Sequence, residues 1–142
     1  MRIEVVEEST EELLDAFQRL VPQLTQINSP PTRADLDALV KSESSTLLVA
    51  RADDLSIVSA LSLTVYRVPT GIRSIIEDVV VDKSARGQGI GEELMRRAIE
   101  LAKEKGAAHV TLTCNPAREA ANRLYLRMGF KKRETNAYIY KI

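Results

Sequence analysis

Apolar residues along this chain switch between the spacing of strands and the spacing of helices, and these switches predict the order of the elements. A short apolar stretch at 3–6 predicts a first strand. Ser9 followed by Glu12 is the pattern of a capping box, which would begin a helix. The apolar residues that follow recur at the spacing of one helix face: Leu13, Leu14, Phe17, Leu20 and Val21. The chain is therefore expected to open with a strand and an amphipathic helix.

A loop and a second, shorter helix are predicted next. Paired prolines cannot continue a helix, so the stretch 28–31 predicts a loop. Thr32 can cap the helix that follows. The apolar face of this helix would be made by Leu36, Leu39 and Val40. The first third of the chain is thus predicted to hold two helices joined by a kinked loop.

Three strands are predicted in the middle of the chain. The stretches 46–52 and 55–66 flank a turn at 53–54, which predicts a hairpin. A second turn at 69–71 leads into a strand at 72–82. The apolar residues of this last strand are nearly continuous, which is typical of a central strand covered on both faces.

Helices and strands alternate in the last part of the chain. The pattern predicts a helix at 88–105, a strand at 110–114 and a second helix at 115–127 that starts with Asn-Pro. The stretches 130–133 and 138–141 then predict a closing hairpin. Together the elements predict an α/β fold with a mixed sheet.

Composition narrows the classes of function. A length of 142 residues fits one domain, 1–142, and 44% hydrophobic residues can supply its core. Twenty basic and twenty acidic residues give no net charge, which removes the usual electrostatic argument for a nucleic-acid partner.

Metal binding, export and membrane insertion are not expected either. Cys114 is the only cysteine and His109 the only histidine, so an intrachain disulfide and the usual zinc ligands are not available. The sequence does not begin with a basic segment before an apolar stretch, and no apolar run reaches the roughly 18–20 residues that span a bilayer. We expect a soluble cytoplasmic protein without a metal.

The most informative segment lies between the predicted strand at 72–82 and the helix that follows. It reads Arg86-Gly87-Gln88-Gly89-Ile90-Gly91. Glycine tolerates backbone angles that side chains forbid, and it lets a ligand approach the main chain closely. The first amides of a helix lack intrahelical partners and carry partial positive charge. With Arg86 at its edge, the segment predicts a binding site for a phosphate or pyrophosphate.

Three phosphate-binding schemes compete for this segment. A nucleotide-hydrolysing loop needs a lysine and a hydroxyl after its last glycine, where this chain has Glu92 and Glu93. A dinucleotide fingerprint needs the spacing GxGxxG, whereas the spacing here is GxGxG. The third scheme, Arg-x-x-Gly-x-Gly, is met by Arg86, Gly89 and Gly91.

This third scheme resembles the acetyl-CoA signature of the GNAT superfamily of N-acetyltransferases. Two further segments are similar to the same family: 76–81, before the glycines, and 120–130, which ends like the family's Tyr-x-x-x-Gly-Phe helix. The order of elements over nearly the whole chain matches as well. The resemblance implies a GNAT-like fold, with a central mixed and mostly antiparallel sheet flanked by helices.

The resemblance also implies which residues hold the donor. The pyrophosphate of acetyl-CoA would lie on the amides of 88–91, and pantetheine along the strand at 79–81. The family often places an asparagine seven residues before the tyrosine of its last helix, where this chain has Arg118, so nearby amides could serve instead. The cofactor-binding residues expected are Val79, Val80, Val81, Arg86, Gly87, Gln88, Gly89, Ile90, Gly91, Asn115, Arg118 and Asn122.

Acyl transfer to an amine needs a base, because an alkylamine is almost entirely protonated at pH 7. Glu77 and Asp78 are adjacent candidates, and they would point to opposite faces of a regular strand. The resemblance favours Glu77, nine residues before the motif arginine. Tyr125 stands at the family's general-acid position, where its hydroxyl would stabilise the leaving thiolate mainly as a hydrogen-bond donor.

The residues and the resemblance together predict an N-acetyltransferase. It would move an acetyl group from acetyl-CoA directly to a primary amine of a small molecule or a protein in a ternary complex. The alternative is a non-catalytic acyl-CoA-binding or regulatory module of the same fold. The acceptor should approach between the N-terminal helices and the strands near Tyr66. The resemblance also allows a homodimer that uses the closing hairpin, and neither nucleic acid nor membrane is an expected partner.

Overall fold

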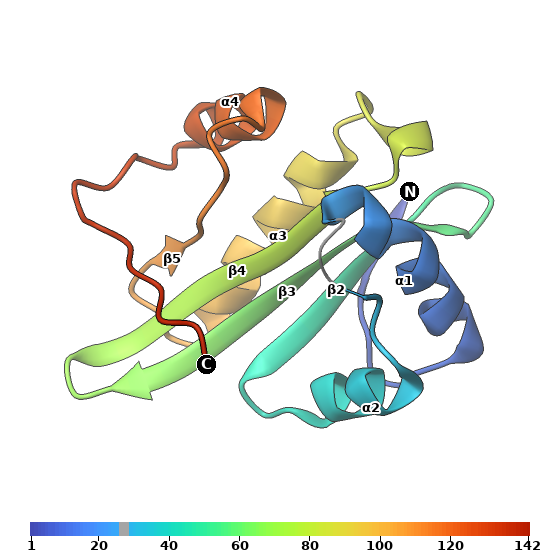
Figure 1. Ribbon diagram of the computed structural model, residues 1–142, viewed down its shortest axis with the longest axis horizontal. Helices are drawn as coiled ribbons and strands as arrows, with labels where there is room; N and C mark the ends of the chain where they lie inside the picture. The colour runs from blue at the N-terminus through green and yellow to red at the C-terminus, as the bar shows by residue number, and fades with distance from the viewer. Residues whose placement is uncertain (26–28) are drawn as a thin grey trace.

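Five strands form one sheet with helices on both of its faces (Figure 1). The computed structural model describes residues 1–25 and 29–142. Neighbouring strands follow the order of the sequence, and all pairs are antiparallel except the last, β4 with β5. The strands are β1 (Arg2–Val5), β2 (Ser45–Arg51), β3 (Ile57–Val68), β4 (Gly71–Val81) and β5 (Val110–Thr111). The predicted α/β fold with a mixed, mostly antiparallel sheet is confirmed.

Two N-terminal helices, α1 (Glu11–Leu24) and α2 (Arg33–Lys41), cover one face of the sheet. Thr32 caps α2, as the sequence predicts, and it does so through a reciprocal capping box with Asp35. Asn28, the first residue of the predicted loop between the helices, lies outside the described residues. Within residues 1–25 and 29–142, no helix is both long and apolar enough to cross a membrane.

The start of α1 differs from the predicted capping box. Thr10, not Ser9, is the N-cap, and its side chain accepts a hydrogen bond from the Leu13 N–H at 3.1 Å. Ser9 instead contacts α2, since its hydroxyl donates to Asp37 and accepts from Arg33 Nε at 3.0 Å. The hydroxyl of Ser9 is thus used between the two helices, and the helix starts one residue later.

A hydrophobic core lies on each face of the sheet. On the α1 and α2 face the buried residues are Leu13, Ala16, Phe17, Leu20, Leu36, Leu47, Val49, Ile57, Ala60 and Val80. On the opposite face the strands pack against α3 (Ile90–Glu104) and α4 (Glu119–Met128), with Leu61, Leu63, Ile76, Ile90, Leu94, Met95 and Ala98 at the centre. Because β4 supplies residues to both cores, the prediction that it is covered on both faces is confirmed.

The first hairpin is shifted relative to its prediction. β3 begins at Ile57 rather than at 55. Leu55 lies in the turn with a φ of +70°, and its N–H donates to the Ala52 carbonyl at 2.9 Å. The apolar side chain of Leu55 therefore extends the strand pattern in sequence without belonging to the strand.

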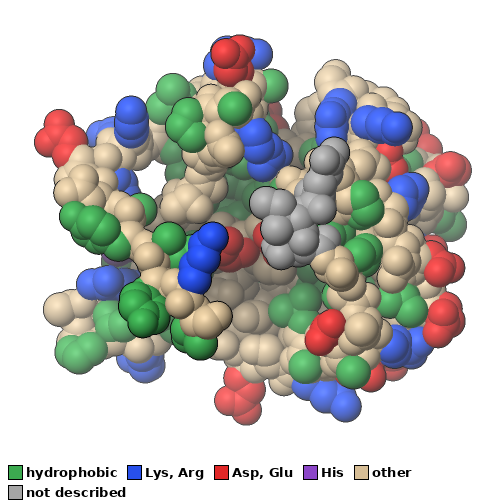
Figure 2. Space-filling view, viewed as in Figure 1, with side chains coloured by type: hydrophobic (Ala, Val, Ile, Leu, Met, Phe, Trp, Pro, Cys, Tyr) green, Lys and Arg blue, Asp and Glu red, His purple; other side chains and the backbone are tan. Residues whose placement is uncertain are grey.

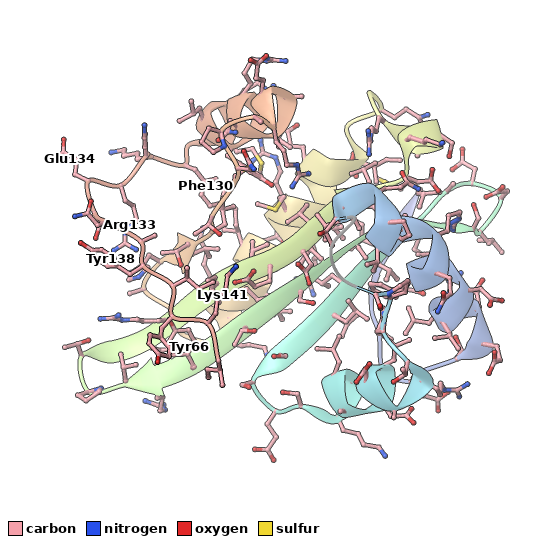
Figure 3. The ribbon with its side chains drawn as sticks, in the orientation of Figure 1. Tyr66, Phe130, Arg133, Glu134, Tyr138 and Lys141 are labelled. Atoms are coloured by element: carbon pink, nitrogen blue, oxygen red, sulfur yellow. The ribbon has the colours of Figure 1, made fainter. Side chains whose placement is uncertain are left out.

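The predicted closing hairpin is wrong. Gly129, with a φ of +105°, ends α4 as predicted, but the residues after it form neither helix nor strand. Tyr138 and Tyr140 are 90% and 91% exposed, and Glu134 lies at an outer bend of this last segment (Figure 3). An isolated two-stranded hairpin is at best marginally stable in water, and β5, which ends at Thr111, offers it almost no edge to join.

Candidate active site

A bulge in β4 lies at the centre of the predicted site. Ala60 pairs with Val80 and Ser62 pairs with Glu77, so β4 has one more residue than β3 between these pairs. Asp78 lies within this stretch, and its φ of +54° is in the left-handed region. Aspartate is among the residues that enter this region most readily. The bulge bends the strand and increases its twist.

The bulge places Glu77 and Asp78 on the same face of the sheet. Ile76 packs into the α3 core and Val80 into the α1 core, although residues four apart in a regular strand share a face. Cross-strand partners also share a face, so Glu77 lies with Ser62 on the α1 and α2 side. Asp78 lines a hollow on that side together with Ser62. The predicted opposite orientation of the two carboxylates is therefore wrong, because strict alternation fails at the extra residue.

The charge of Asp78 and partial burial both act on the protonation of Glu77. Partial burial raises the pKa of Glu77, and the negative charge of Asp78 raises it further. A carboxylate with a raised pKa is a stronger base. Glu77 is therefore the candidate proton acceptor whose basicity the neighbouring charge of Asp78 increases.

The outer edge of β4 is open beyond Ile75. β5 pairs with β4 at only two positions, Ser74 with Val110 and Ile75 with Thr111, and the chain then leaves towards α4 (Figure 1). The strand predicted at 110–114 is thus shorter than expected. Because no other described strand takes its place, the last part of β4 presents main-chain donors and acceptors on this side.

The start of α3 is shaped as an anion site. Gly87 and Gly89 both have a φ of +77°, which side chains rarely adopt. Gly89 is the N-cap of α3 and supplies no capping side chain. The first main-chain hydrogen bond of the helix runs from the Glu93 N–H to the Gly89 carbonyl at 3.1 Å. The amides of 90–92 therefore have no partner within the helix and can face an anion.

Gly91 is needed for packing rather than for its backbone angle. A Cβ at this position would lie 3.2 Å from Val81 Cγ2 and 4.0 Å from Leu124 Cδ2. The first contact is tighter than a side chain normally makes with a branched neighbour. Glycine therefore lets the first turn of α3 approach β4 and α4 closely.

Polar contacts fix the segment between β4 and α3, which contains the short helix η1 (Lys83–Ala85). Arg86 Nε donates to the Val81 carbonyl at 3.1 Å. Asp82, only 6% exposed, accepts hydrogen bonds from the Ser84 N–H and hydroxyl, each at 3.0 Å. Side chains that precede the glycines therefore tie the segment 86–91, the glycine loop, to the end of β4.

Helix α1 contributes to the same anchor. Arg19 donates to Asp82 at 3.4 Å and to the Ile57 carbonyl at 2.7 Å, and Gln23 accepts from the Lys83 N–H at 2.8 Å. The Ser84 N–H, and to a lesser extent Arg19, hold the pKa of Asp82 below its usual value. Arg19 and Gln23 were not predicted from the sequence, because nothing in their spacing points to a contact so distant in the chain. The Asp-x-Ser spacing at 82–84 was the only local signal for a turn there.

Tyr125 lies on α4 with its ring in the core. The side chain is 7% exposed, and the ring packs edge-to-face on Phe130, with 5.8 Å between the centroids. Within the described chain its hydroxyl has no hydrogen-bond partner, although every fully buried polar side-chain atom there has one. The hydroxyl oxygen therefore still reaches solvent and can donate to a ligand. Burial and the nearby Cys114 raise the pKa of Tyr125, so the phenol keeps its proton.

The turn before α4 brings three predicted cofactor residues together. α4 begins at Glu119 rather than at 115, because the Asn115 side chain closes a turn by accepting from the Ala117 N–H at 2.9 Å. Asn122 Nδ2 donates to the carbonyls of Asn115 at 3.0 Å and Arg118 at 2.9 Å. Both hydrogens of that amide are used, so only the oxygen of Asn122 can bind a ligand.

The predicted cofactor residues lie on β4, at the start of α3 and in the turn into α4, and not all of them can act through their side chains. Val80 and Ile90 are 3% and 5% exposed, so each can offer a ligand only its main chain. Val79 and Val81 are half-buried against the α3 core, and Gln88 is exposed on the loop. Lys and Arg side chains appear in Figure 2 along the edge of the molecule where the glycine loop and α4 lie. This surface suits an anionic ligand.

The sequence pattern of the Acetyltransferase (GNAT) family matches residues 8–130. The chain belongs to this family. Among curated proteins, this GNAT chain is 37% identical over 65 residues to glucosamine 6-phosphate N-acetyltransferase 1 of Oryza sativa subsp. japonica, covering 46% of this chain and 38% of that protein. It is 38% identical over 89 residues to the streptothricin acetyltransferase of Streptomyces lavendulae, covering 62% of this chain and 45% of that protein. The aligned region therefore spans less than half of either relative.

A solved structure with the same fold covers the whole GNAT chain. It is a transcriptional regulator from Bacillus halodurans C-125, which is 28% identical and superposes with a TM-score of 0.78, covering 99% of this chain and 100% of that one. The similarity extends to β5 and α4, the elements that flank the open edge. In the part of the GNAT chain that the structure describes, no cluster of three or more His, Cys, Asp or Glu side chains could hold a metal ion.

Proposed function

We propose that this chain is an N-acetyltransferase that uses acetyl-CoA as the donor and a primary amine of a small molecule or a protein as the acceptor. Residues 1–142 would act as one domain. The observation that carries the proposal is the glycine loop beside the open edge of β4. A ligand with a pyrophosphate and an amide-containing arm would use both features at once, and acetyl-CoA is such a ligand. Membership of the GNAT family supports the same donor.

The donor would be held mainly by the main chain. The amides at the start of α3 would bind the pyrophosphate, with Arg86 beside them, and the main chain of 79–81 would pair with the pantetheine amides. A helix terminus stabilises an exposed anion by about 0.3–1 kcal/mol, so several amides and Arg86 must act together. Asn115, Arg118 and Asn122 would border the donor from the α4 side.

Glu77 would prepare the acceptor for attack. It would take a proton from the ammonium, directly or through water, and the neutral amine would then attack the acetyl carbonyl. The raised pKa of Glu77 supports this role, because a stronger base draws the proton from the ammonium more effectively. Transfer would be direct, with no acylated side chain, in a complex that holds donor and acceptor together.

Tyr125 would stabilise the departing thiolate of CoA. A thiol has a pKa of about 8.5 and a tyrosine of about 10, so full proton transfer from the phenol is uphill by roughly 2 kcal/mol. Burial raises the pKa of Tyr125 still further. Its hydroxyl would therefore act as a hydrogen-bond donor while the C–S bond breaks, rather than as a full acid.

A non-catalytic acyl-CoA-binding or regulatory module is the second candidate. One observation favours it: a solved structure that superposes over the whole chain is a transcriptional regulator. Such a module would use the glycine loop in the same way and would not need the carboxylate pair or the free tyrosine hydroxyl.

The two candidates can be separated by measuring binding and turnover on the same preparation. Acetyl-CoA should raise the melting temperature of the chain, since a ligand that binds only the folded state stabilises it. The enzyme should then release free CoA thiol in the presence of amines, and Glu77→Gln should suppress that release. Binding without release on any class of amine would favour the module. The absence of a thermal shift would reject both candidates.

A further inference from the structure

A hollow on the α1 and α2 face adjoins the carboxylate pair. Its volume is about 330 Å³, at the lower end of the roughly 300–1,000 Å³ typical of small-molecule sites. Asp78 and Ser62 line it on the sheet side. The opposite walls are mostly apolar and include Phe17, Val21, Leu24, Leu36 and Leu39. Hydrophobic side chains are visible on this face of the molecule in Figure 2.

The charges at this hollow all have one sign. Of the described residues that line it, Asp35 and Asp78 are charged, and both are carboxylates. Glu77, on the same face, adds a third negative group close to Asp78. The arginines of the two helices are engaged elsewhere, Arg19 with Asp82 at 3.4 Å and Arg33 with Glu11 at 2.8 Å. The hollow therefore combines apolar walls with a negative side next to the proposed base.

We propose that the acceptor is a small cationic amine with an apolar substituent and without a phosphate or carboxylate group; this inference rests on the acetyl transfer proposed above. The ammonium group is attracted to Glu77 and Asp78, which brings it to the base. The apolar substituent fills the space between α1, α2 and the sheet. A phosphate or carboxylate on the acceptor would meet carboxylates and no free cation among the described lining residues, and like charges placed together are strongly unfavourable.

This selectivity differs from that of a relative. The rice protein is named for glucosamine 6-phosphate, which is a polar and anionic acceptor. The hollow described here does not suit such an acceptor, because its walls are apolar and its charged residues are negative, as the phosphate is. Similarity over 46% of the chain therefore does not extend to the acceptor.

The first test uses the unmodified protein with saturating acetyl-CoA. In the series from ethylamine to hexylamine, kcat/KM should rise about fourfold for each methylene until the hollow is filled. The kcat/KM for tyramine should exceed that for tyramine phosphate, which carries the same amine, by at least about tenfold. A flat alkyl series, or an equal or greater kcat/KM for tyramine phosphate, would overturn the inference while leaving acetyl transfer intact.

A binding measurement separates this inference from the proposed function. Calorimetric titration of the same amines into the protein loaded with CoA should give affinities that rise with chain length and fall with the phosphate. If thiol release fails with every amine but this order of affinities holds, the acetyl-transfer proposal fails and the assignment of the hollow stands. If the order does not hold, the assignment of the hollow fails, whatever the turnover.

Two variants place the effect in the hollow. Asp78→Asn should raise the ratio of kcat/KM for tyramine phosphate over tyramine by about threefold or more, and this ratio cancels any common loss of catalysis. Leu39→Ala should lower kcat/KM for hexylamine about tenfold more than kcat/KM for ethylamine, because it removes part of the apolar wall of the hollow. Leu126→Ala is the matched control, since Leu126 is 61% exposed on α4 and does not line the hollow. Equal effects of the two leucine variants would contradict the assignment. So would an unchanged ratio of kcat/KM for tyramine phosphate over tyramine in Asp78→Asn.

Discussion

Replacing Gly89 by alanine tests the glycine loop most directly. Gly89 has a φ of +77°, and a Cβ there would meet nothing within 4 Å, so the substitution causes backbone strain without a clash. A residue with a side chain pays about 1–2 kcal/mol in this left-handed conformation. The loop can keep its shape and lose stability, or relax in the free protein and be restored by the ligand at a cost in affinity. The losses of folding and binding free energy should therefore sum to about 1–2 kcal/mol.

Because Gly87, Gln88 and Gly89 are exposed, we expect the loop of Gly89→Ala to relax and most of the loss to fall on binding. The dissociation constant of acetyl-CoA should then rise by about 5–30-fold. Calorimetric titration gives this constant, and thermal unfolding gives the share that falls on stability. For 142 residues the entropy of unfolding is about 0.3 kcal/mol/K, so the full strain would lower the melting temperature by about 3–7 °C.

Gly106→Ala is the matched control. Gly106 lies just beyond the other end of α3, with a φ of +84°, and therefore suffers the same strain far from the loop. Its substitution should lower the melting temperature and leave the affinity for acetyl-CoA unchanged. A normal affinity in Gly89→Ala together with an unchanged melting temperature would mean that the loop has relaxed without any effect on the donor, and it would refute the reasoning that these amides bind the donor.

Three further substitutions test the other parts of the site. Glu77→Gln should lower kcat/KM at pH 7 by about 10²–10⁴-fold and remove the acidic limb of the wild-type pH profile. The midpoint of that limb should lie above the ordinary pKa of glutamate, because the pKa of Glu77 is raised. A variant that keeps both the wild-type kcat/KM and the acidic limb would show that another group is the base. Tyr125→Phe keeps the ring packing and should slow turnover by about 10–100-fold with little change in melting temperature, and unchanged turnover would remove its hydroxyl from the mechanism. Asp82→Asn should cost about 1–3 kcal/mol in urea unfolding at pH 7. Since the pKa of Asp82 is lowered, its charge stabilises the fold at pH values above the unfolded-state pKa of about 3.9. The difference in free energy of unfolding between Asp82→Asn and the wild type should therefore narrow as the pH falls below about 4. An equal difference at pH 7 and below pH 4 would rule out the charge of Asp82 as the cause.

Local patterns in the sequence predicted the features that depend on neighbouring residues. Thr32 and the helix after it, the end of α4 at Gly129, and the glycine loop all follow from residues within one or two turns of each other. Each uses a rule about backbone angles or capping that needs no knowledge of the rest of the fold. The same holds for the two-sided burial of β4, which its continuous apolar run indicates.

The failures have a common cause in contacts that the sequence does not reveal. Strict alternation placed Glu77 and Asp78 on opposite faces, but the extra residue in β4 can be seen only against its partner β3. Arg19 was not predicted because its partner Asp82 is distant in the chain. The strand at 110–114 has the right composition, but the chain diverges from β4 after Thr111, so only two of its residues pair.

The bulge in β4 also affects how the free protein behaves in solution. A long, regular strand edge with unpaired main-chain groups is a template on which another chain can add a strand, and this leads to aggregation. β4 has such an edge beyond Ile75, but the extra residue at Asp78 bends and twists it where the pairing would continue. The irregularity that gathers the carboxylates for chemistry therefore also protects the open edge from a foreign strand, and a mutation that straightened β4 would endanger solubility together with activity.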